Sequence, residues 1–194
     1  MFPSDISKED INKLPLDKYN GEIVLIDKTE DVAEAMNEIS QYEYVGIDTE
    51  TKPVFVKGQY NHVSLIQIAI PNKVFLIRLH KTGLTDELII FFENKKIKKI
   101  GVALADDIKD LQKLKRFKGE EFFELNQLVK SIGIESNGLK KLVAIILGYR
   151  ISKSAQVSNW ESPELTEKQL RYGATDAFVC LEMFEKLKSL NFLN

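Results

Sequence analysis

Two acidic residues lie at the end of an apolar segment in the first third of the chain. Asp48 and Glu50 fall in a predicted strand, and side chains two residues apart on a strand project from the same face. Val45, Ile47 and Thr49 then occupy the opposite face. Two neighbouring carboxylates repel one another and force one pKa upward unless a cation lies between them. The pair is therefore a candidate metal site, with a strand edge whose acids simply face water as the alternative.

Gly46 lies on the same face as these acids, two residues before Asp48. The strand that carries them is predicted over Tyr44–Glu50, with an apolar opposite face. Because glycine has no Cβ atom, we expect open room beside the two carboxylates.

A third acidic residue, Asp107, begins a predicted helix. Leu111 and Leu114 follow it at spacings that place all three residues on one helical stripe directed at the core. The adjacent Asp106 belongs to a polar stripe and is interpreted as a cap or a solvated acid. Asp107 is thus the candidate ligand of the two, and a helix N-cap is the alternative for it.

A tyrosine and an aspartate, Tyr172 and Asp176, lie one helical turn apart in the last predicted helix. Continued along the helix, their row meets the apolar residues Val179 and Met183. An aspartate within an apolar stripe is costly unless it is paired or bound to metal. The alternative is that Asp176 lies at the solvated margin of the stripe.

Together these segments supply four carboxylates and one phenol, each predicted to point inward: Asp48, Glu50, Asp107, Tyr172 and Asp176. Carboxylate ligands without histidine or cysteine favour hard cations such as Mg²⁺ or Mn²⁺. Two such ions, roughly 3.5–4 Å apart, stabilise the attacking and leaving oxygens at a phosphodiester. Four negative charges would balance two divalent cations. The predicted chemistry is therefore two-metal hydrolysis of a phosphodiester.

The bulk properties are those of one globular domain. The chain has 194 residues, of which 44 % are hydrophobic and 29 % charged. The single cysteine, Cys180, excludes an internal disulfide framework and a cysteine-rich zinc site. The apolar runs are too short to cross a bilayer, and the N-terminus lacks the apolar core of a signal peptide. We expect a cytoplasmic protein that does not associate with membranes.

Net charge counts mildly against a nucleic-acid partner. The charge is −2 at pH 7, and the sequence pI is about 5.8. Nucleic-acid binders usually carry a basic surface. Divalent cations held by carboxylates would attract phosphate groups in its place.

Strands and helices alternate after an N-terminal polar arm. Residues 1–20 form this arm, with one helical turn expected after Ser7, and residues 21–194 form one domain. Strands are predicted over Glu22–Ile26, Tyr44–Glu50, Val63–Ile70, Lys73–Leu79 and Lys99–Leu104, while Phe122–Leu128 is compatible with a short one. Helices are predicted over Thr29–Ile39, Leu84–Glu93, Asp107–Phe117, Leu139–Leu147 and from a capping box at Thr166 to about Leu190. This order indicates one α/β domain on a mixed sheet.

Three ordered motifs resemble the DEDD exonuclease superfamily, specifically its Werner-syndrome-exonuclease and RNase D branch. They are residues 45–50 (VGIDTE) followed by 63–68 (VSLIQI), residues 99–103 (KIGVA) running into Asp106-Asp107, and residues 172–177 (YGATDA) preceded by 158–160 and 165–166. The resemblance covers about residues 22–190. It implies an α/β, RNase H-like fold with a five-stranded mixed sheet flanked by helices, and it makes residues 21–194 a 3′-5′ exonuclease domain.

The resemblance also implies roles for the candidate residues. Asp48, Glu50 and Asp176 would hold the first metal ion, with Asp48 bridging to the second. Asp107 would support the second ion directly or through water. Tyr172 stands where the tyrosine subclass places the phenol that orients the attacking water. The implied activity is 3′→5′ hydrolysis at DNA or RNA 3′ ends with release of nucleoside monophosphates, and no cofactor beyond the two ions is implied.

Two departures from the family pattern affect substrate preference. Thr51-Lys52-Pro53 follows Glu50, where Werner-type enzymes tend to have a bulky aromatic residue. Lys109 stands two residues after Asp107, at a position where some of these enzymes carry a second bulky aromatic residue. Both positions lie where the terminal nucleotide would be gripped. The sequence therefore leaves open whether the substrate is DNA or RNA.

Several other side chains have two interpretations. A lysine run around Ile97 is either a phosphate track or a solvated connection between helix and strand; it consists of Lys95, Lys96, Lys98 and Lys99. Trp160 is interpreted as a buried anchor rather than a platform that stacks on a base. Cys180 is expected in the core, and His62 and His80 are expected at the surface.

Two other functions stay open. One is a non-catalytic nucleic-acid-binding or scaffolding module on the same fold. Degenerate members of that kind would be expected to lose a carboxylate, and none of the four is missing. The other is a metal-dependent phosphatase or nucleotidase that acts on small substrates.

Overall fold

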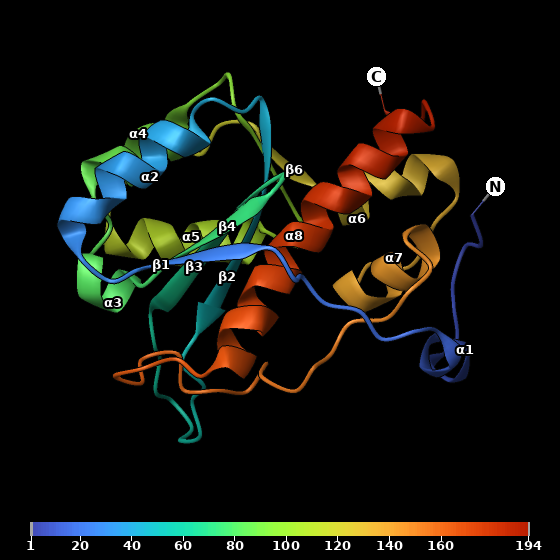
Figure 1. Cartoon of the computed structure of the whole chain (residues 1–194), viewed down its shortest axis with the longest axis horizontal. Coiled ribbons are helices and arrows are strands. Elements are labelled where there is room, and N and C mark those ends of the chain that lie inside the picture. Colours follow the sequence, from blue (N-terminus) through green and yellow to red (C-terminus); the bar gives the residue numbers. More distant parts are fainter. Residues whose placement is uncertain (1, 194) are drawn as a thin grey trace.

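A six-stranded mixed sheet forms the centre of the computed structural model, which describes residues 2–193 (Figure 1). In spatial order its strands are β1 (Glu22–Ile26), β4 (Lys73–Ile77), β3 (Val63–Ile70), β2 (Tyr44–Thr51), β5 (Lys98–Gly101) and β6 (Phe122–Glu124). β3 runs antiparallel to both of its neighbours, β2 and β4, and the other neighbours pair in parallel. The α/β class is confirmed. The expected count of five strands is wrong, because the short strand β6 pairs with β5 and adds a sixth at the sheet edge.

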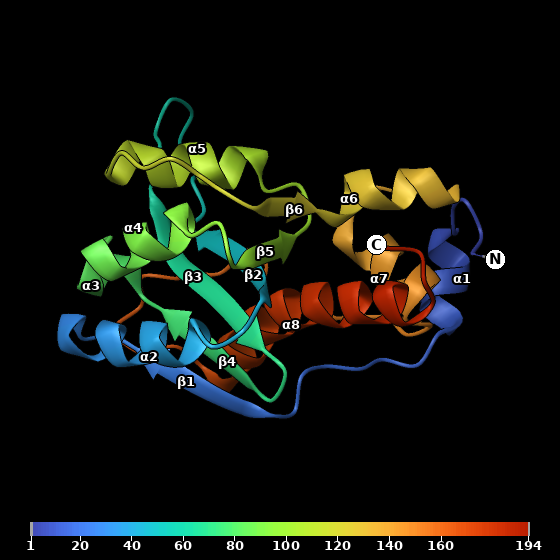
Figure 2. The same ribbon diagram turned by 90° about the horizontal axis from the view of Figure 1, so that it is seen from above.

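Helices cover both faces of this sheet. The α-helices of the described chain are α1 (Lys8–Lys13), α2 (Val32–Ile39), α3 (Leu79–Thr82), α4 (Asp86–Glu93), α5 (Ala105–Leu114), α6 (Leu125–Leu128), α7 (Leu139–Ile146) and α8 (Glu167–Ser189). Helices α2, α4 and α5 pack against one face, where Val45 and Ile47 of β2 belong to the same apolar cluster. The long helix α8 crosses the other face beside Leu65 and Leu76, and α7 lies next to α8 (Figure 2).

Two predicted strands end earlier than expected. The strand predicted over Lys73–Leu79 gives way to α3, which begins at Leu79. The strand predicted over Lys99–Leu104 stops at Gly101, because Ala103 takes a φ of 58° that an extended chain does not allow. The resulting sharp turn delivers the chain directly into α5.

Gly46 lies where α8 comes closest to β2. A Cβ atom at this position would lie 2.1 Å from the carbonyl oxygen of Ala177 and 3.1 Å from the Cβ atom of Leu181. The expectation of open room beside the carboxylates is therefore wrong, because the backbone of α8 fills that space. Glycine here permits the close approach that brings the helix onto the strand carrying Asp48.

The N-terminal segment packs along the end of the molecule that carries α7 (Figure 2). The helical turn expected after Ser7 is present as α1, and the Ser7 hydroxyl accepts a hydrogen bond from the backbone N–H of Asp10 at 3.0 Å. A parallel bridge joins Leu16 to Arg150. Within residues 2–193, no helix is both long enough and apolar enough to cross a bilayer. The division into an arm and a domain stays a prediction.

Replacing Gly46 with alanine is expected to lower the free energy of unfolding by about 1–3 kcal/mol, because the new methyl group would meet backbone rather than a movable side chain. Thermal denaturation followed by circular dichroism measures the loss. Gly173→Ala is the matched control on α8, since its Cβ would meet Gln67 and Leu65 at ordinary distances of 3.4–3.6 Å and alanine favours a helix. A melting temperature for Gly46→Ala equal to that of the wild type would contradict the close approach.

Candidate active site

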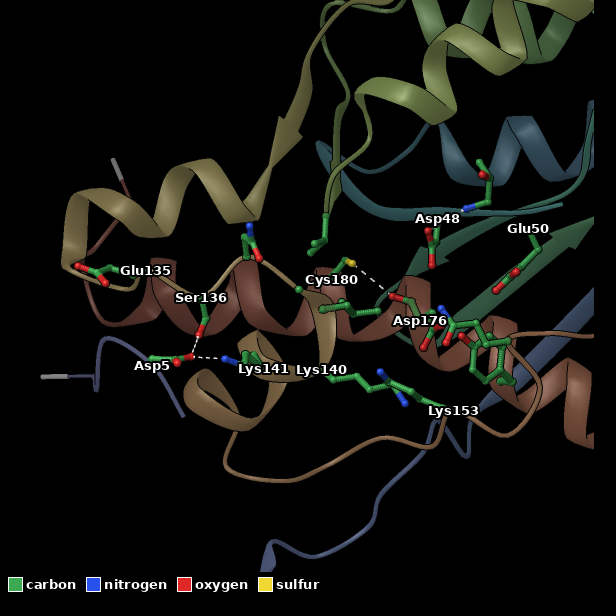
Figure 3. A pocket seen from close by; sticks show the side chains of 17 residues that line it. Asp5, Asp48, Glu50, Glu135, Ser136, Lys140, Lys141, Lys153, Asp176 and Cys180 are labelled. Atoms are coloured by element: carbon green, nitrogen blue, oxygen red, sulfur yellow. Dashed lines mark hydrogen bonds and ion pairs between the residues drawn. The ribbon is translucent and has the colours of Figure 1, made fainter. Parts of the chain in front are cut away.

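Asp48 and Glu50 lie near the end of β2, on the face covered by α8. In the register with β3, Asp48 lies opposite Gln67, and a bulge follows Glu50. Bulges next to a site re-aim the side chains beside them. Both carboxylates line one large cavity together with Tyr172 and Asp176 (Figure 3). The structure thus brings together four of the five side chains that the sequence singles out.

The N-terminal half of α8 carries Tyr172 and Asp176, and the preceding loop fixes where the helix begins. The predicted capping box at the start of α8 is present, and the side-chain amide of Gln169 also donates to the carbonyl oxygen of Asn159 at 3.2 Å. Trp160 is fully buried, and its ring centroid lies 6.0 Å from that of Tyr172. The interpretation of Trp160 as a buried anchor is confirmed.

Asp107 lies half-buried in the first turn of α5, whereas the adjacent Asp106 is exposed and pairs with Lys109 at 2.8 Å. The helix pattern therefore distinguishes the two aspartates. The predicted stripe is nevertheless too long, because Leu114 is 38 % exposed. The carboxylate of Asp107 accepts a hydrogen bond from the hydroxyl of Thr49, a residue that the sequence assigned only to the apolar face of its strand.

Burial raises the pKa values of all four candidate carboxyl groups. Desolvation is the largest cause, and it raises the pKa of Glu50 to about 9 and that of Asp176 to about 7. The pKa of Asp48 lies well above its usual range through desolvation and the negative charges of Asp176 and Asp107. Burial also raises the pKa of Asp107. These groups favour the protonated form until a cation offsets their charge.

The same groups fit a divalent metal ion. One carboxylate oxygen of Asp176, Oδ1, is buried without a hydrogen-bond partner among the described residues. Such an oxygen is costly unless it binds a cation. Within residues 2–193, no three side chains of the types that bind metals converge tightly enough to hold an ion as they stand, so binding would have to draw the acids together. The donors are all carboxylate oxygens, which suits Mg²⁺ or Mn²⁺.

The cavity has a volume of about 760 Å³ and extends well beyond the acids. Figure 3 shows Asp48, Glu50 and Asp176 toward one end and Asp5 toward the other. The wall between them comes mainly from the start of α7 and the loop before α8; it includes Ser136, Asn137, Leu139, Lys140, Lys141, Lys153 and Gln156. Asp107 does not belong to this lining and acts on the other acids only through its charge. A cavity of this size suits a ligand larger than metal ions alone.

The lysine run that precedes and begins β5 lies away from the acids. β5 pairs in parallel with the start of β2, whereas Asp48 and Glu50 lie near the end of β2. Lys99 is fully buried, and its ammonium group donates to the carbonyl oxygens of Asn94 and Glu120, both at 2.7 Å. Lys99 is therefore neither available to bind a phosphate group nor part of a solvated connection between helix and strand.

The expectations for the two histidines and the cysteine are confirmed. His62 and His80 are exposed, and neither lines the cavity around the acids. Cys180 is buried in α8, where its Sγ donates to the carbonyl oxygen of Asp176 at 3.2 Å.

Carboxylates gathered in one cavity could hold two divalent ions, the arrangement by which metal-dependent enzymes cleave phosphodiesters. The family model described as 3′-5′ exonuclease matches residues 23–190 of this chain. The chain belongs to this 3′-5′ exonuclease family. The RNase H-like arrangement implied by the sequence motifs is confirmed by the solved structures that it resembles.

Two curated relatives and one solved structure illustrate the similarity. The chain is 32 % identical over 189 residues to the bifunctional 3′-5′ exonuclease/ATP-dependent helicase WRN of Mus musculus, covering 92 % of this chain and 14 % of that protein. It is 31 % identical over 189 residues to ribonuclease D of Bartonella henselae, covering 94 % and 45 %. The crystal structure of the Aedes aegypti Nibbler EXO domain matches with a TM-score of 0.81 and 26 % identity, covering 90 % of this chain and 93 % of that one. The chain thus spans less than half the length of either curated relative.

Metal-free protein should lose stability as the pH rises. Because the pKa values of Glu50 and Asp176 are raised in the folded state, that state holds protons that the unfolded state has already released. Their contribution to the free energy of unfolding is therefore complete below about pH 4 and is lost by about pH 9. Melting temperatures measured in EDTA across this range test the decline, and added Mn²⁺ should raise them most at the alkaline end.

Asp176→Asn should make this decline shallower and weaken the effect of Mn²⁺, because it removes one of the buried charges. Asp106→Asn is the control, since Asp106 is exposed and should leave both measurements close to those of the wild type. If Asp176→Asn and the wild type showed the same dependence on pH, these acids would not be the source of the decline.

Proposed function

We propose that this chain is a 3′→5′ exonuclease that hydrolyses phosphodiester bonds at nucleic-acid 3′ ends with two divalent ions and releases nucleoside monophosphates. The observation that carries the proposal is the cavity in which β2 and α8 bring together Asp48, Glu50, Tyr172 and Asp176. Membership of the 3′-5′ exonuclease family supports the direction of degradation. Mg²⁺ or Mn²⁺ is the proposed cofactor, because every candidate ligand is a carboxylate.

Four carboxylates are proposed to hold the ions. Asp48, Glu50 and Asp176 would hold the ions in the cavity, and Asp107 would support them directly or through water. Bound there, the ions would stabilise the charge on the attacking and leaving oxygens. Thr49 would orient Asp107 through its hydrogen bond. Metal binding would release the protons that burial keeps on these acids.

Tyr172 is proposed to orient the water that attacks phosphorus. Burial raises the pKa of its phenol far above the neutral range, and the negative charges of Asp176 and Glu50 add to the rise. The hydroxyl therefore stays protonated and serves as a hydrogen-bonding group rather than as a base. The buried ring of Trp160 lies beside the phenol and limits its movement.

The proposed substrate is the 3′ end of DNA or RNA. One relative is named ribonuclease D and another combines an exonuclease with a helicase, and both names describe those proteins rather than this chain. The non-aromatic segment Thr51-Lys52-Pro53 after Glu50 lies where the terminal nucleotide would be held. A cytoplasmic location without membrane association is likewise a proposal, supported by composition alone.

A digestion panel tests the proposed activity. DNA and RNA oligomers labelled at either end are incubated with and without Mn²⁺, and the wild type should shorten them from the 3′ end one nucleotide at a time. Asp48→Ala and Asp176→Ala should each lower turnover roughly 100-fold or more, because each loses a ligand that places the ions. Asp106→Ala is the matched control on an exposed aspartate and should retain activity.

Unchanged digestion by both alanine variants would refute the proposal. Hydrolysis of mononucleotide esters without any cleavage of oligomers would indicate a nucleotidase instead. Binding of oligomers without Mn²⁺ binding or cleavage would indicate a non-catalytic module.

Tyr172→Phe is expected to lower kcat by roughly tenfold to 100-fold with little change in KM, because the hydroxyl acts on the attacking water rather than on bound substrate. Steady-state kinetics on a labelled oligomer separate the two constants. Tyr149→Phe is the control, since it removes a partly buried hydroxyl that donates to Glu182 outside the cavity. A loss confined to KM would contradict this role for Tyr172.

A further inference from the structure

Among the described residues, two ammonium groups that line the cavity, those of Lys140 and Lys153, form no ion pair with a carboxylate. Lys153 is exposed to solvent. Lys140 is half-buried in the first turn of α7, and its Nζ donates to the carbonyl oxygen of Ile151 at 3.2 Å. Within residues 2–193, no carboxylate oxygen lies within 4.0 Å of this Nζ. The negative charge of Asp176, at the acid end of the cavity, acts on this ammonium group and raises its pKa. The positive charge of Lys140 is therefore attracted toward the acids, but no carboxylate forms an ion pair with it.

The neighbouring Lys141 differs in this respect. Its Nζ lies 2.6 Å from a carboxylate oxygen of Asp5, which belongs to the N-terminal segment. The same oxygen accepts a hydrogen bond from the hydroxyl of Ser136. Of the two adjacent lysines that line the cavity, Lys140 is the one whose charge is available to a ligand.

Lys140 lies between the two ends of the cavity. In Figure 3 its side chain extends from α7 toward the acids, whereas Asp5, Ser136 and Lys141 gather at the far end. A strand whose last phosphodiester lay at the acids would have to continue along this wall to remain in the cavity of about 760 Å³. Its next phosphate would then pass Lys140.

We propose that Lys140 is a positioning residue that binds the phosphate on the 5′ side of the scissile phosphodiester and so directs the substrate strand along the first turn of α7. The inference rests on the proposed function, because it requires a polynucleotide with its 3′ end at the acids. It adds the path of the strand and a residue that contacts the backbone. Such a contact places the strand without reading its base sequence.

A partly dehydrated ammonium group suits this contact. Desolvation lowers the pKa of Lys140 to about 8, while the attraction of Asp176 acts in the opposite direction. A phosphate group would replace the lost hydration with a charge-assisted hydrogen bond. The contact also offsets part of the repulsion between a polyanion and a chain of net charge −2.

Lys140→Gln and Lys140→Arg test the contact in steady-state digestion of a labelled DNA oligomer with Mn²⁺. Lys140→Gln should raise KM roughly tenfold with little change in kcat, because it removes one charged hydrogen bond to the strand. The slope of log KM against log salt concentration should become shallower by about 0.7, the value for one phosphate contact on a single strand. Lys140→Arg keeps the charge and should restore both values.

Lys96→Gln is the matched control for the loss of one positive charge. Lys96 is exposed and lies just before β5, away from the acids. This variant should show the KM and the salt dependence of the wild type. If it lost as much as Lys140→Gln, the effect would come from net charge rather than from a local contact, and the proposal would be overturned.

A substrate with a single phosphodiester separates positioning from chemistry. The p-nitrophenyl ester of thymidine 5′-phosphate has no second phosphate, so Lys140→Gln should hydrolyse it as fast as the wild type does. If Lys140→Gln lost as much activity on this ester as on the oligomer, the proposal would be overturned. It would also be overturned if the KM and the salt slope of this variant on the oligomer equalled those of the wild type.

Failure of the proposed function would give a different result. If the wild type cleaved neither substrate, the exonuclease activity would be refuted, yet binding of the oligomer could still be compared by fluorescence anisotropy with Ca²⁺ in place of Mn²⁺. Weaker and less salt-dependent binding by Lys140→Gln would support the contact. Binding equal to that of the wild type would overturn it.

Discussion

Repulsion among buried carboxyl groups is the constraint on which the rest of this structure depends. Asp48, Glu50 and Asp176 lose their hydration in one cavity, and the pKa of each is raised in consequence. Acids in such surroundings destabilise a fold at neutral pH unless a cation binds between them. Extensive apolar clusters on both faces of the sheet supply the compensating stability. A bound metal ion would therefore account for this cluster of acids, which without a cation would destabilise the folded state.

The elements around the acids leave them little freedom to separate. The missing Cβ of Gly46 lets the backbone of α8 lie directly on β2, so that the strand and the helix present their acids to the same space. The loop before α8 is fixed in turn by Trp160 at its centre and by Arg78, which donates to the carbonyl oxygens of Ser162 and Pro163. Close packing of strand, helix and loop thus overcomes the tendency of like charges to move apart.

Local periodicity in the sequence was sufficient to predict most of this site, and long-range contacts account for what it missed. Alternation along a strand places Asp48 and Glu50 on one face, and helical spacing separates Asp107 from Asp106. The hydrogen bond from Thr49 to Asp107 joins residues 58 positions apart, beside a bulge that no local pattern marks. The sequence alone does not distinguish Lys140 from Lys141. Only the fold shows that Lys141 forms an ion pair with Asp5, 136 positions earlier in the chain, and that Lys140 does not. The sixth strand falls within Phe122–Leu128, a segment for which the sequence leaves a short strand open, because three residues carry too little pattern to define a strand.

Calorimetric titration of Mn²⁺ into metal-free protein near neutral pH tests most directly whether these acids form a site for divalent ions. Repeated in buffers of different ionisation enthalpy, the titration reports both the ions bound and the protons released. We expect two ions per chain and a net release of protons, because Asp48 and Glu50, the latter with a pKa of about 9, hold protons until an ion displaces them. An absence of binding heat, or binding without proton release, would contradict this expectation.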